Sequence, residues 1–141
     1  MNKKLKILYC GLKFDYGSPS NGYSFEHYNF YNTFTNMANV ELVDYVPMDE
    51  LIVNNSQNYL NDEIINLSKK KKYDLVFFFM FKDEIYINTL NYLKNELSIP
   101  TVAWMADDHW RFDTYSKYIA KYFSYVVTTD EASIPKYVKN G

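Results

Sequence analysis

The stretch Leu75-Val-Phe-Phe-Phe-Met-Phe81 decides the fold, because all seven of its residues are apolar. A continuous apolar run of this length predicts a strand that is covered on both faces, as the strands of parallel sheets are. It is too short for a membrane helix, which needs about 20 residues. Four more runs are predicted as strands: residues 5–10, 40–46, 101–106 and 125–129.

Between these runs, apolar side chains recur every three or four residues, and this spacing predicts amphipathic helices. The four stripes consist of Tyr23, His27, Phe30, Phe34 and Met37, then Leu60, Ile64 and Leu67, then Tyr86, Leu90, Leu93 and Leu97, and finally Tyr115, Ile119 and Tyr122. A short fifth helix is predicted from near Ser133 to Asn140, with Pro135 in its first turn and Gly141 at its end.

Strands that alternate with helices predict a Rossmann-like α/β domain, in which a doubly wound parallel sheet of about five strands carries helices on both faces. Residues 1–141 are expected to form this single domain. The expected strand order is 3-2-1-4-5. Ligands of such sheets bind outside the carboxyl ends of the strands, here near the switch point between the first and fourth strands.

The composition argues against several classes of function. A net charge of −2 lacks the basic excess of a nucleic-acid-binding domain, and no segment is long enough to span a membrane. Cys10, the only cysteine, lies in an apolar run and is predicted to be a buried thiol suited to a reducing compartment. Residues 1–10 do not resemble a signal peptide, so a cytoplasmic location is expected. The lysines at 69–72 are predicted to end a helix, where cations are favoured.

The loop of residues 11–22 is the first candidate site, because it follows the first strand and contains Gly11, Gly17 and Gly22. Amides at the N-terminus of the next helix would favour an anion, and Ser18 and Asn21 would add side-chain contacts. The glycines match neither a dinucleotide-binding fingerprint nor a P-loop. A surface loop without a ligand is an equally good reading of this segment.

His27 and Glu26 lie about one turn into the first predicted helix, close to the ends of the strands. A histidine there is a candidate general base, because its pKa is ordinarily near neutral. Glu26 is a candidate for substrate contact and for the same proton transfer. Packing on the apolar stripe is the alternative for His27, and it is the more common role of such a histidine.

A second candidate site follows the fourth strand, in the segment Trp104-Met-Ala-Asp-Asp-His-Trp-Arg-Phe-Asp113. Asp108 is a catalytic candidate, and Asp107, Trp110 and Arg111 are substrate-binding candidates, because acidic, basic and aromatic side chains together are typical of sugar and nucleotide sites. Consecutive acidic residues point in different directions, so no metal is expected. Capping by the aspartates and packing by the aromatic rings are the structural alternative.

The residues at the ends of the third and fifth predicted strands also bear on the function. Asp130 follows the fifth strand and is predicted either to contact substrate or to cap the last helix. The third strand ends in Phe79-Met-Phe81, without an aspartate. A phosphoacceptor receiver domain is therefore excluded, because its chemistry needs an aspartate at that position.

A family resemblance rests on four segments: Lys6-Ile-Leu-Tyr-Cys-Gly11, Pro100-Thr-Val-Ala-Trp-Met-Ala-Asp-Asp-His-Trp-Arg-Phe112, Phe123-Ser-Tyr-Val-Val-Thr-Thr-Asp-Glu-Ala-Ser133 and Tyr137-Val-Lys-Asn-Gly141. Together they resemble the N-terminal half of GT-B glycosyltransferases, and most closely the CgeB-like type associated with spore maturation. The resemblance spans essentially the whole chain, and its most specific parts are residues 104–112 and 126–130.

The resemblance implies a two-domain enzyme that moves a sugar from a nucleotide-sugar donor to a glycan or small-molecule acceptor, without a metal or other cofactor. The N-terminal domain would bind the acceptor, and Asp107, Asp108 and Arg111 would line the cleft between the domains together with the loop of residues 11–22. The donor would bind mainly to a C-terminal domain, which the family pattern places after Gly141. Residues 1–141 alone are therefore expected to transfer sugar poorly or not at all.

Two other classes of function stay open. The glycine-bearing first loop also fits a stand-alone α/β module that binds a nucleotide or a sugar without catalysis. The 15 tyrosines and 10 phenylalanines fit an interaction surface, although compositional bias explains them better.

Overall fold

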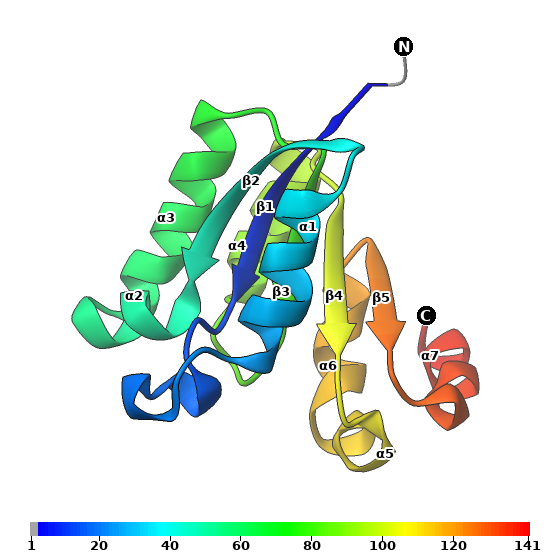
Figure 1. Cartoon of the computed structure of the whole chain (residues 1–141). Coiled ribbons are helices and arrows are strands. Elements are labelled where there is room, and N and C mark those ends of the chain that lie inside the picture. The colour runs from blue at the N-terminus through cyan, green and yellow to red at the C-terminus, as the bar shows by residue number, and fades with distance from the viewer. Residues whose placement is uncertain (1–2) are drawn as a thin grey trace.

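The structure, a computed structural model, describes residues 3–141. Its centre is a sheet of five strands, all parallel, as predicted: β1 (Leu5–Gly11), β2 (Val40–Pro47), β3 (Leu75–Phe79), β4 (Thr101–Met105) and β5 (Tyr125–Thr128). Helices lie on both faces of the sheet, so the Rossmann-like class is confirmed (Figure 1). In Figure 1 the arrows of β1, β2, β4 and β5 point toward the lower edge, and β3 is parallel to its neighbours β1 and β4.

The strand order is β2-β1-β3-β4-β5, and the predicted order 3-2-1-4-5 is wrong. That order would have placed β3 at an edge of the sheet. The predicted edge strand is the most apolar of the five, whereas β2 carries Glu41 and Asp44. An edge position suits charged residues, and a central position lets the apolar side chains of β3 be covered on both faces. The switch point therefore lies between β1 and β3.

The helices follow from the four predicted stripes, with additional short turns. The α-helices are α1 (Asn32–Asn36), α2 (Met48–Asn54), α3 (Gln57–Lys70), α4 (Ile87–Asn91), α5 (Asp108–Arg111), α6 (Lys117–Ile119) and α7 (Ile134–Asn140). π-helical turns extend three of them at η3 (His27–Tyr31), η4 (Tyr92–Glu96) and η5 (Phe112–Ser116). Single 3₁₀ turns are η1 (Asp15–Gly17), η2 (Pro19–Asn21), η6 (Ala120–Tyr122) and η7 (Glu131–Ser133). The sequence patterns did not predict α2 or α5.

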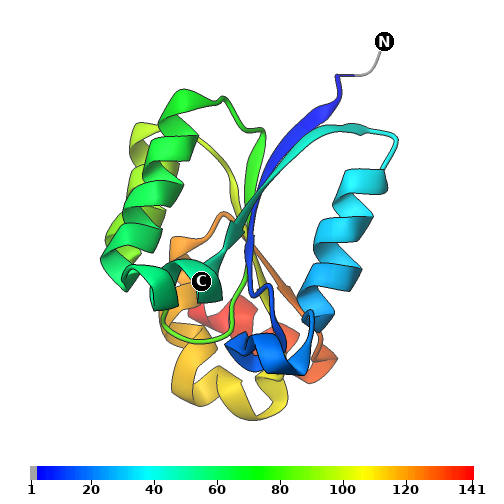
Figure 2. The ribbon, with the colours of Figure 1, turned by 60° about the vertical axis from the view of Figure 1, so that its left-hand side comes forward.

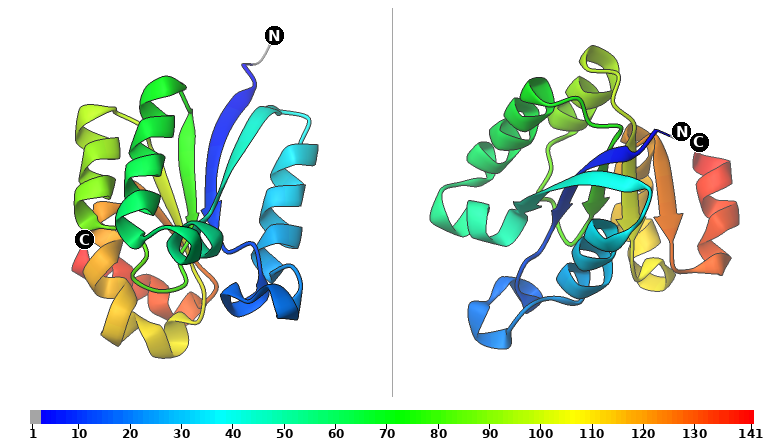
Figure 3. Two further views of the ribbon diagram at one scale, coloured as in Figure 1. Left: turned by 90° about the vertical axis from the view of Figure 1, so that its left-hand side faces the viewer. Right: turned by 45° about the horizontal axis from the view of Figure 1, so that its top comes forward.

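The two faces of the sheet carry unequal numbers of helices. The segment of η3 and α1 lies on one face, and α3 and α4 lie on the other (Figures 2 and 3). This arrangement follows from right-handed crossovers: the chain moves from β1 to β2 in one direction and then back past β1 to β3, β4 and β5 in the other. A reversal of direction moves the connecting helices to the opposite face.

Each face has its own hydrophobic cluster. The larger cluster joins the sheet to α3, α4 and α6 and includes Leu8, Phe78, Leu60 and Leu93, all fully buried. The smaller cluster is largely aromatic and packs Tyr9 and Phe77 against the η3–α1 segment. Most of the abundant phenylalanine and tyrosine residues on this face therefore serve packing.

Two smaller predictions also concern this fold. Cys10 is completely buried, and burial raises the pKa of its thiol well above the usual value, as expected of an unreactive core cysteine. Lys69 and Lys70 form the last turn of α3, as predicted for a helix C-terminus. Within residues 3–141, no helix has the length and apolar character needed to cross a membrane.

Candidate functional site

A cleft of about 740 Å³ lies at the carboxyl ends of β1, β3 and β4. Six aromatic or charged positions of its lining come from the last residue of β3 and from the loops after β1 and β3: Phe79, Asp15, Tyr16, Phe81, Lys82 and Asp83. Others come from the first helix and from the segment after β4: Phe25, Glu26, Asp107, Trp110, Arg111 and Tyr115. The cleft therefore lies at the observed switch point, where open α/β sheets bind their ligands.

The cleft combines aromatic rings with an excess of negative charge. Its carboxylates belong to Asp15, Glu26, Asp83 and Asp107, and its cations to Lys82 and Arg111. Carboxylates accept hydrogen bonds from hydroxyl groups, whereas they repel phosphate groups. This balance of charge favours a hydroxyl-rich ligand over a nucleotide.

Arg111 is held in place by the loop after β3. Its Nη2 atom donates a hydrogen bond to the carbonyl oxygen of Phe81 at 2.9 Å, and its guanidinium lies 4.5 Å from the centre of the Tyr115 ring. The Tyr115 hydroxyl donates to the carbonyl oxygen of Lys82 at 2.8 Å. These contacts fix a cation and an aromatic ring in one wall of the cleft.

Glu26 is the most deeply buried carboxyl group of the cleft, with 9% of the residue exposed. Burial raises the pKa of this carboxyl group, and hydrogen bonds from its own amide and from Ser24 oppose the rise. The nearby carboxylates of Asp15 and Asp49 raise the pKa further. The raised pKa makes this carboxylate a better proton acceptor than an exposed glutamate.

His27 lies beside Glu26 in sequence but is not part of the cleft lining. Its ring is stacked on that of Tyr23, with 4.4 Å between the ring centres. Its Nδ1 atom is buried without a hydrogen-bond partner among the described residues, and burial lowers the pKa of the imidazole. This placement favours the packing alternative for His27 over the predicted catalytic role.

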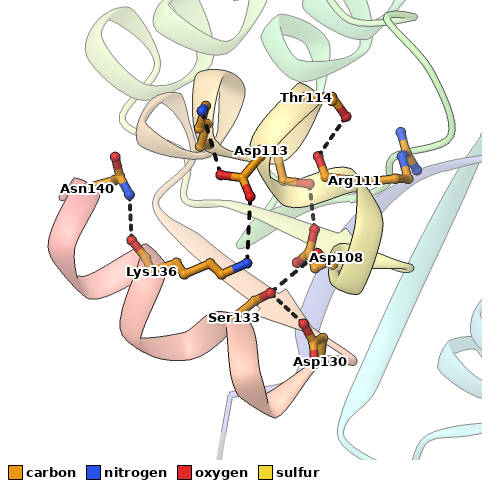
Figure 4. A network of polar contacts seen from close by, with 10 residues as sticks. Asp108, Arg111, Asp113, Thr114, Asp130, Ser133, Lys136 and Asn140 are labelled. Carbon is orange, nitrogen blue, oxygen red and sulfur yellow. Dashed lines mark hydrogen bonds and ion pairs between the residues drawn. The ribbon is translucent and has the colours of Figure 1, made fainter.

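Asp108 is completely buried and is also outside the cleft lining. Its Oδ1 atom accepts a hydrogen bond from the Ser116 hydroxyl at 2.6 Å, and its Oδ2 atom accepts from Thr128 and Tyr137, each at 2.6 Å. Figure 4 shows Asp108, the first residue of α5, beside Ser133 at the end of η7. Both carboxylate oxygens are occupied by the protein itself, which favours a structural role over the predicted catalytic one.

Asp130 is the cap of the last helical segment. Its side chain accepts hydrogen bonds from the amide of Ala132 and from the hydroxyl of Ser133 (Figure 4). Asp130 does not line the cleft. Of the two alternatives that the sequence left open, the structure shows the helix cap.

The first loop folds back on itself and leaves few free donors for an anion. The amides of Lys13 and Phe14 donate to the Asp49 carboxylate at 2.8 and 3.0 Å, so an internal anion already occupies them. The amides of Gly17, Ser18, Asn21 and Gly22 donate to carbonyl groups of the same loop. The Ser24 hydroxyl accepts from the amide of His27 and thereby caps the first helix.

The residues of this loop that line the cleft are therefore not the ones predicted from the sequence. Ser18, Asn21, Gly22 and Gly11 do not line the cleft. Gly11 has a packing role, because a Cβ atom there would collide with the Tyr9 hydroxyl. The loop contributes Asp15 and Tyr16 instead, and Tyr16 adopts a left-handed backbone conformation with φ of 50°.

The structure thus brings together Glu26, Asp107, Trp110 and Arg111 from the predicted set. Sequence reasoning missed the loop after β3, residues 81–83. The predicted strand order placed β3 at an edge of the sheet, away from the switch point. In the observed order β3 is central, so the loop that follows it lies at the switch point. No group of three or more histidine, cysteine or acidic side chains within residues 3–141 is arranged to hold a metal ion.

Fold and site together define the class as a parallel α/β domain with an acidic, aromatic cleft at its switch point. Comparisons of this chain with protein-family models, with curated proteins and with solved structures give no match.

Proposed function

We propose that the cleft binds a carbohydrate or another polyhydroxylated acceptor, and that the chain is the acceptor-side domain of a glycosyltransferase. The observation that supports this proposal is the lining itself, in which four carboxylates stand among aromatic rings. Aromatic rings supply a rigid apolar surface for the CH groups of a sugar, and carboxylates accept hydrogen bonds from its hydroxyl groups. The resemblance to GT-B enzymes points to the same role.

In this proposal Glu26 is the general base. Its carboxylate takes the proton of an acceptor hydroxyl while the hydroxyl oxygen forms a bond to the anomeric carbon of the donor sugar. The bond from that carbon to the nucleotide phosphate breaks, and the phosphate leaves with the electron pair. Glu26 is preferred to Asp108 and His27 because it alone of the three lines the cleft. A second domain would hold most of the nucleotide-sugar donor.

The alternative is a sugar-binding module that uses the same cleft without chemistry. The excess of carboxylates favours sugars over nucleotides in this case as well. The two functions differ in the role of Glu26, because only the transferase needs it as a base. A Glu26→Gln variant of the two-domain enzyme that the proposal implies separates them: it keeps sugar binding in both cases and lowers the transfer rate about 100-fold or more only if Glu26 is the base.

The binding part of the proposal is tested through the two tryptophans of the chain, each of which gives one indole N–H signal by NMR. Trp110 lines the cleft and is 61% exposed, whereas Trp104 packs against Phe30, with 4.8 Å between the ring centres. Titration with the methyl glycosides of glucose, galactose, mannose and N-acetylglucosamine should give a saturable shift of the Trp110 signal for at least one sugar. The Trp104 signal should move little.

Two variants sharpen this experiment. Trp110→Ala removes the indole signal itself, so its binding is measured by calorimetry and should be abolished, while Tyr125→Ala, at a comparably exposed aromatic residue (65%) on β5, should leave binding unchanged. If no sugar of the panel moves the Trp110 signal, the proposal fails. If a nucleoside diphosphate moves it more than any sugar does, the cleft is a nucleotide site.

A further inference from the structure

A second cavity of about 480 Å³ adjoins the cleft. The two share Asp83, Thr114 and Tyr115, which form the wall between them. The second cavity extends from this wall toward the start of α4 and the segment around α6, where Ile87 and Tyr118 lie. Each volume lies in the range of small-molecule sites, so the pair can accommodate one ligand with two parts.

The lining of the second cavity differs in chemistry from that of the cleft. It contains three isoleucines, three tyrosines and a single charged residue, Asp83, which belongs to the shared wall. Ile87 is 42% exposed and Tyr118 is 61% exposed, so apolar surface faces the cavity without a cover. Burial of such surface by a ligand is favourable.

Several polar groups of the second cavity are already hydrogen-bonded within the protein. The Gln57 amide donates to the carbonyl oxygens of Asp83 and Glu84, and the Thr114 hydroxyl donates to the carbonyl oxygen of Arg111 at 3.4 Å. The hydroxyl of Tyr86 donates to the Oδ1 atom of Asn58 at 2.8 Å. Few free partners remain for the hydroxyl groups of a sugar, so this cavity suits an apolar group.

The walls are also fixed before any ligand binds. The amide of Tyr86 donates to the Oδ1 atom of the buried Asn61 at 2.9 Å. Tyr115, in the wall shared with the cleft, is held by the hydrogen bond from its hydroxyl to the carbonyl oxygen of Lys82. A preformed wall lowers the entropic cost of binding.

We propose that the acceptor is amphiphilic, with a hydroxyl-bearing part in the cleft and an apolar ring or short alkyl segment in the second cavity. This inference rests on the proposed function and names its substrate class. The continuity of the two cavities through Asp83, Thr114 and Tyr115 supports a single ligand that crosses the shared wall.

The test compares methyl and hexyl glycosides of the same sugar, for the four sugars of the panel, with the Trp110 indole signal as the readout. The hexyl glycosides are kept below the concentration at which they form micelles. Five additional methylene groups that enter the second cavity should lower the dissociation constant at least about tenfold. Ile87→Ser should remove most of this gain and leave the affinity for the methyl glycoside unchanged.

Val138→Ser is the matched control, because Val138 is an exposed aliphatic residue on α7 that lines neither cavity. It should leave the gain intact. Equal affinities for methyl and hexyl glycosides would overturn this inference while the proposed function stands, and so would a gain that persists in Ile87→Ser. If neither glycoside moves the Trp110 signal, the proposed function itself fails.

Discussion

The carboxylate of Asp108 accepts a hydrogen bond from the hydroxyl of Tyr137 at 2.6 Å, across 29 residues of sequence. The bond connects the segment after β4 to α7, and the Thr128 hydroxyl bonds to the same carboxylate oxygen. Asp108 is completely buried, and all three of its hydroxyl donors come from segments that follow it in the chain. It therefore joins the C-terminal part of the domain to β4.

The first prediction concerns stability. Tyr137→Phe should lower the free energy of unfolding by about 1.5 to 3 kcal/mol, the usual contribution of a hydrogen bond to a charged group. Urea denaturation measures this change. Tyr118→Phe is the control and should stay within about 0.5 kcal/mol, because Tyr118 lies at the surface. Equal effects of the two substitutions would contradict the structural role assigned to Asp108.

The second prediction concerns pH. The pKa of Glu26 is raised in the folded protein, chiefly by burial, so the folded state binds this proton more tightly than the unfolded state does. Its contribution to stability is therefore fully present below the ordinary glutamate pKa of about 4.3 and is lost as the pH rises through the raised value. Glu26→Gln should stabilise the protein at pH 7, and this gain should shrink toward pH 4.

Urea denaturation of the unmodified protein and of Glu26→Gln at several pH values checks this prediction. Glu131→Gln, at an exposed position, is the control and should change the stability little at any of them. A stabilisation by Glu26→Gln that does not depend on pH would show that loss of the charge is not its cause.

The third prediction uses the strained backbone of Tyr16. Its φ of 50° is left-handed, which costs a residue with a side chain roughly 1 to 2 kcal/mol relative to glycine. Tyr16→Gly should relieve this strain, although glycine loses more entropy on folding and the contact with Phe81 disappears. The free energy of unfolding should thus stay the same or rise by up to about 1 kcal/mol, while the sugar affinity of the cleft falls.

Ser98→Gly is the matched control for Tyr16, because Ser98 has a φ of 53° and lies outside both cavities. It should give a similar change in stability and leave the sugar affinity unchanged. Denaturation combined with the Trp110 titration measures both quantities. An unchanged affinity in Tyr16→Gly would remove Tyr16 from the site.

The sequence was sufficient for the five strands and the parallel sheet, because continuous apolar runs and helical spacing depend only on local periodicity. It did not determine the strand order, which depends on how helices pack on the two faces. The switch point was predicted between the first and fourth strands but lies between β1 and β3. For this reason Phe81, Lys82 and Asp83, which follow β3, were not predicted as lining residues of the cleft. The hydrogen bonds of Asp108 were not foreseen for a related reason, since its partners Ser116, Thr128 and Tyr137 come together only in the folded chain.

The fourth prediction concerns the buried amide of Asn61, which fixes the loop before α4. Its Nδ2 atom donates to the carbonyl oxygens of Gln57 and Glu84, both at 2.9 Å. Its Oδ1 atom accepts from the amide of Tyr86 at 2.9 Å and from the Thr89 hydroxyl at 2.8 Å. The Asn61 side chain thus bonds two donors and two acceptors, and no other side chain of the same size can replace this pattern.

Asn61→Asp should therefore lower the free energy of unfolding by at least about 3 kcal/mol at pH 7, because a carboxylate oxygen would face two carbonyl oxygens that have lost their donor. Asn66→Asp, at an exposed position of the same helix, is the control and should change stability by less than about 0.5 kcal/mol. Urea denaturation provides the comparison. If Asn61→Asp were as stable as the control, the loop that carries Tyr86 would not depend on this amide, and the wall of the second cavity would not be fixed by it.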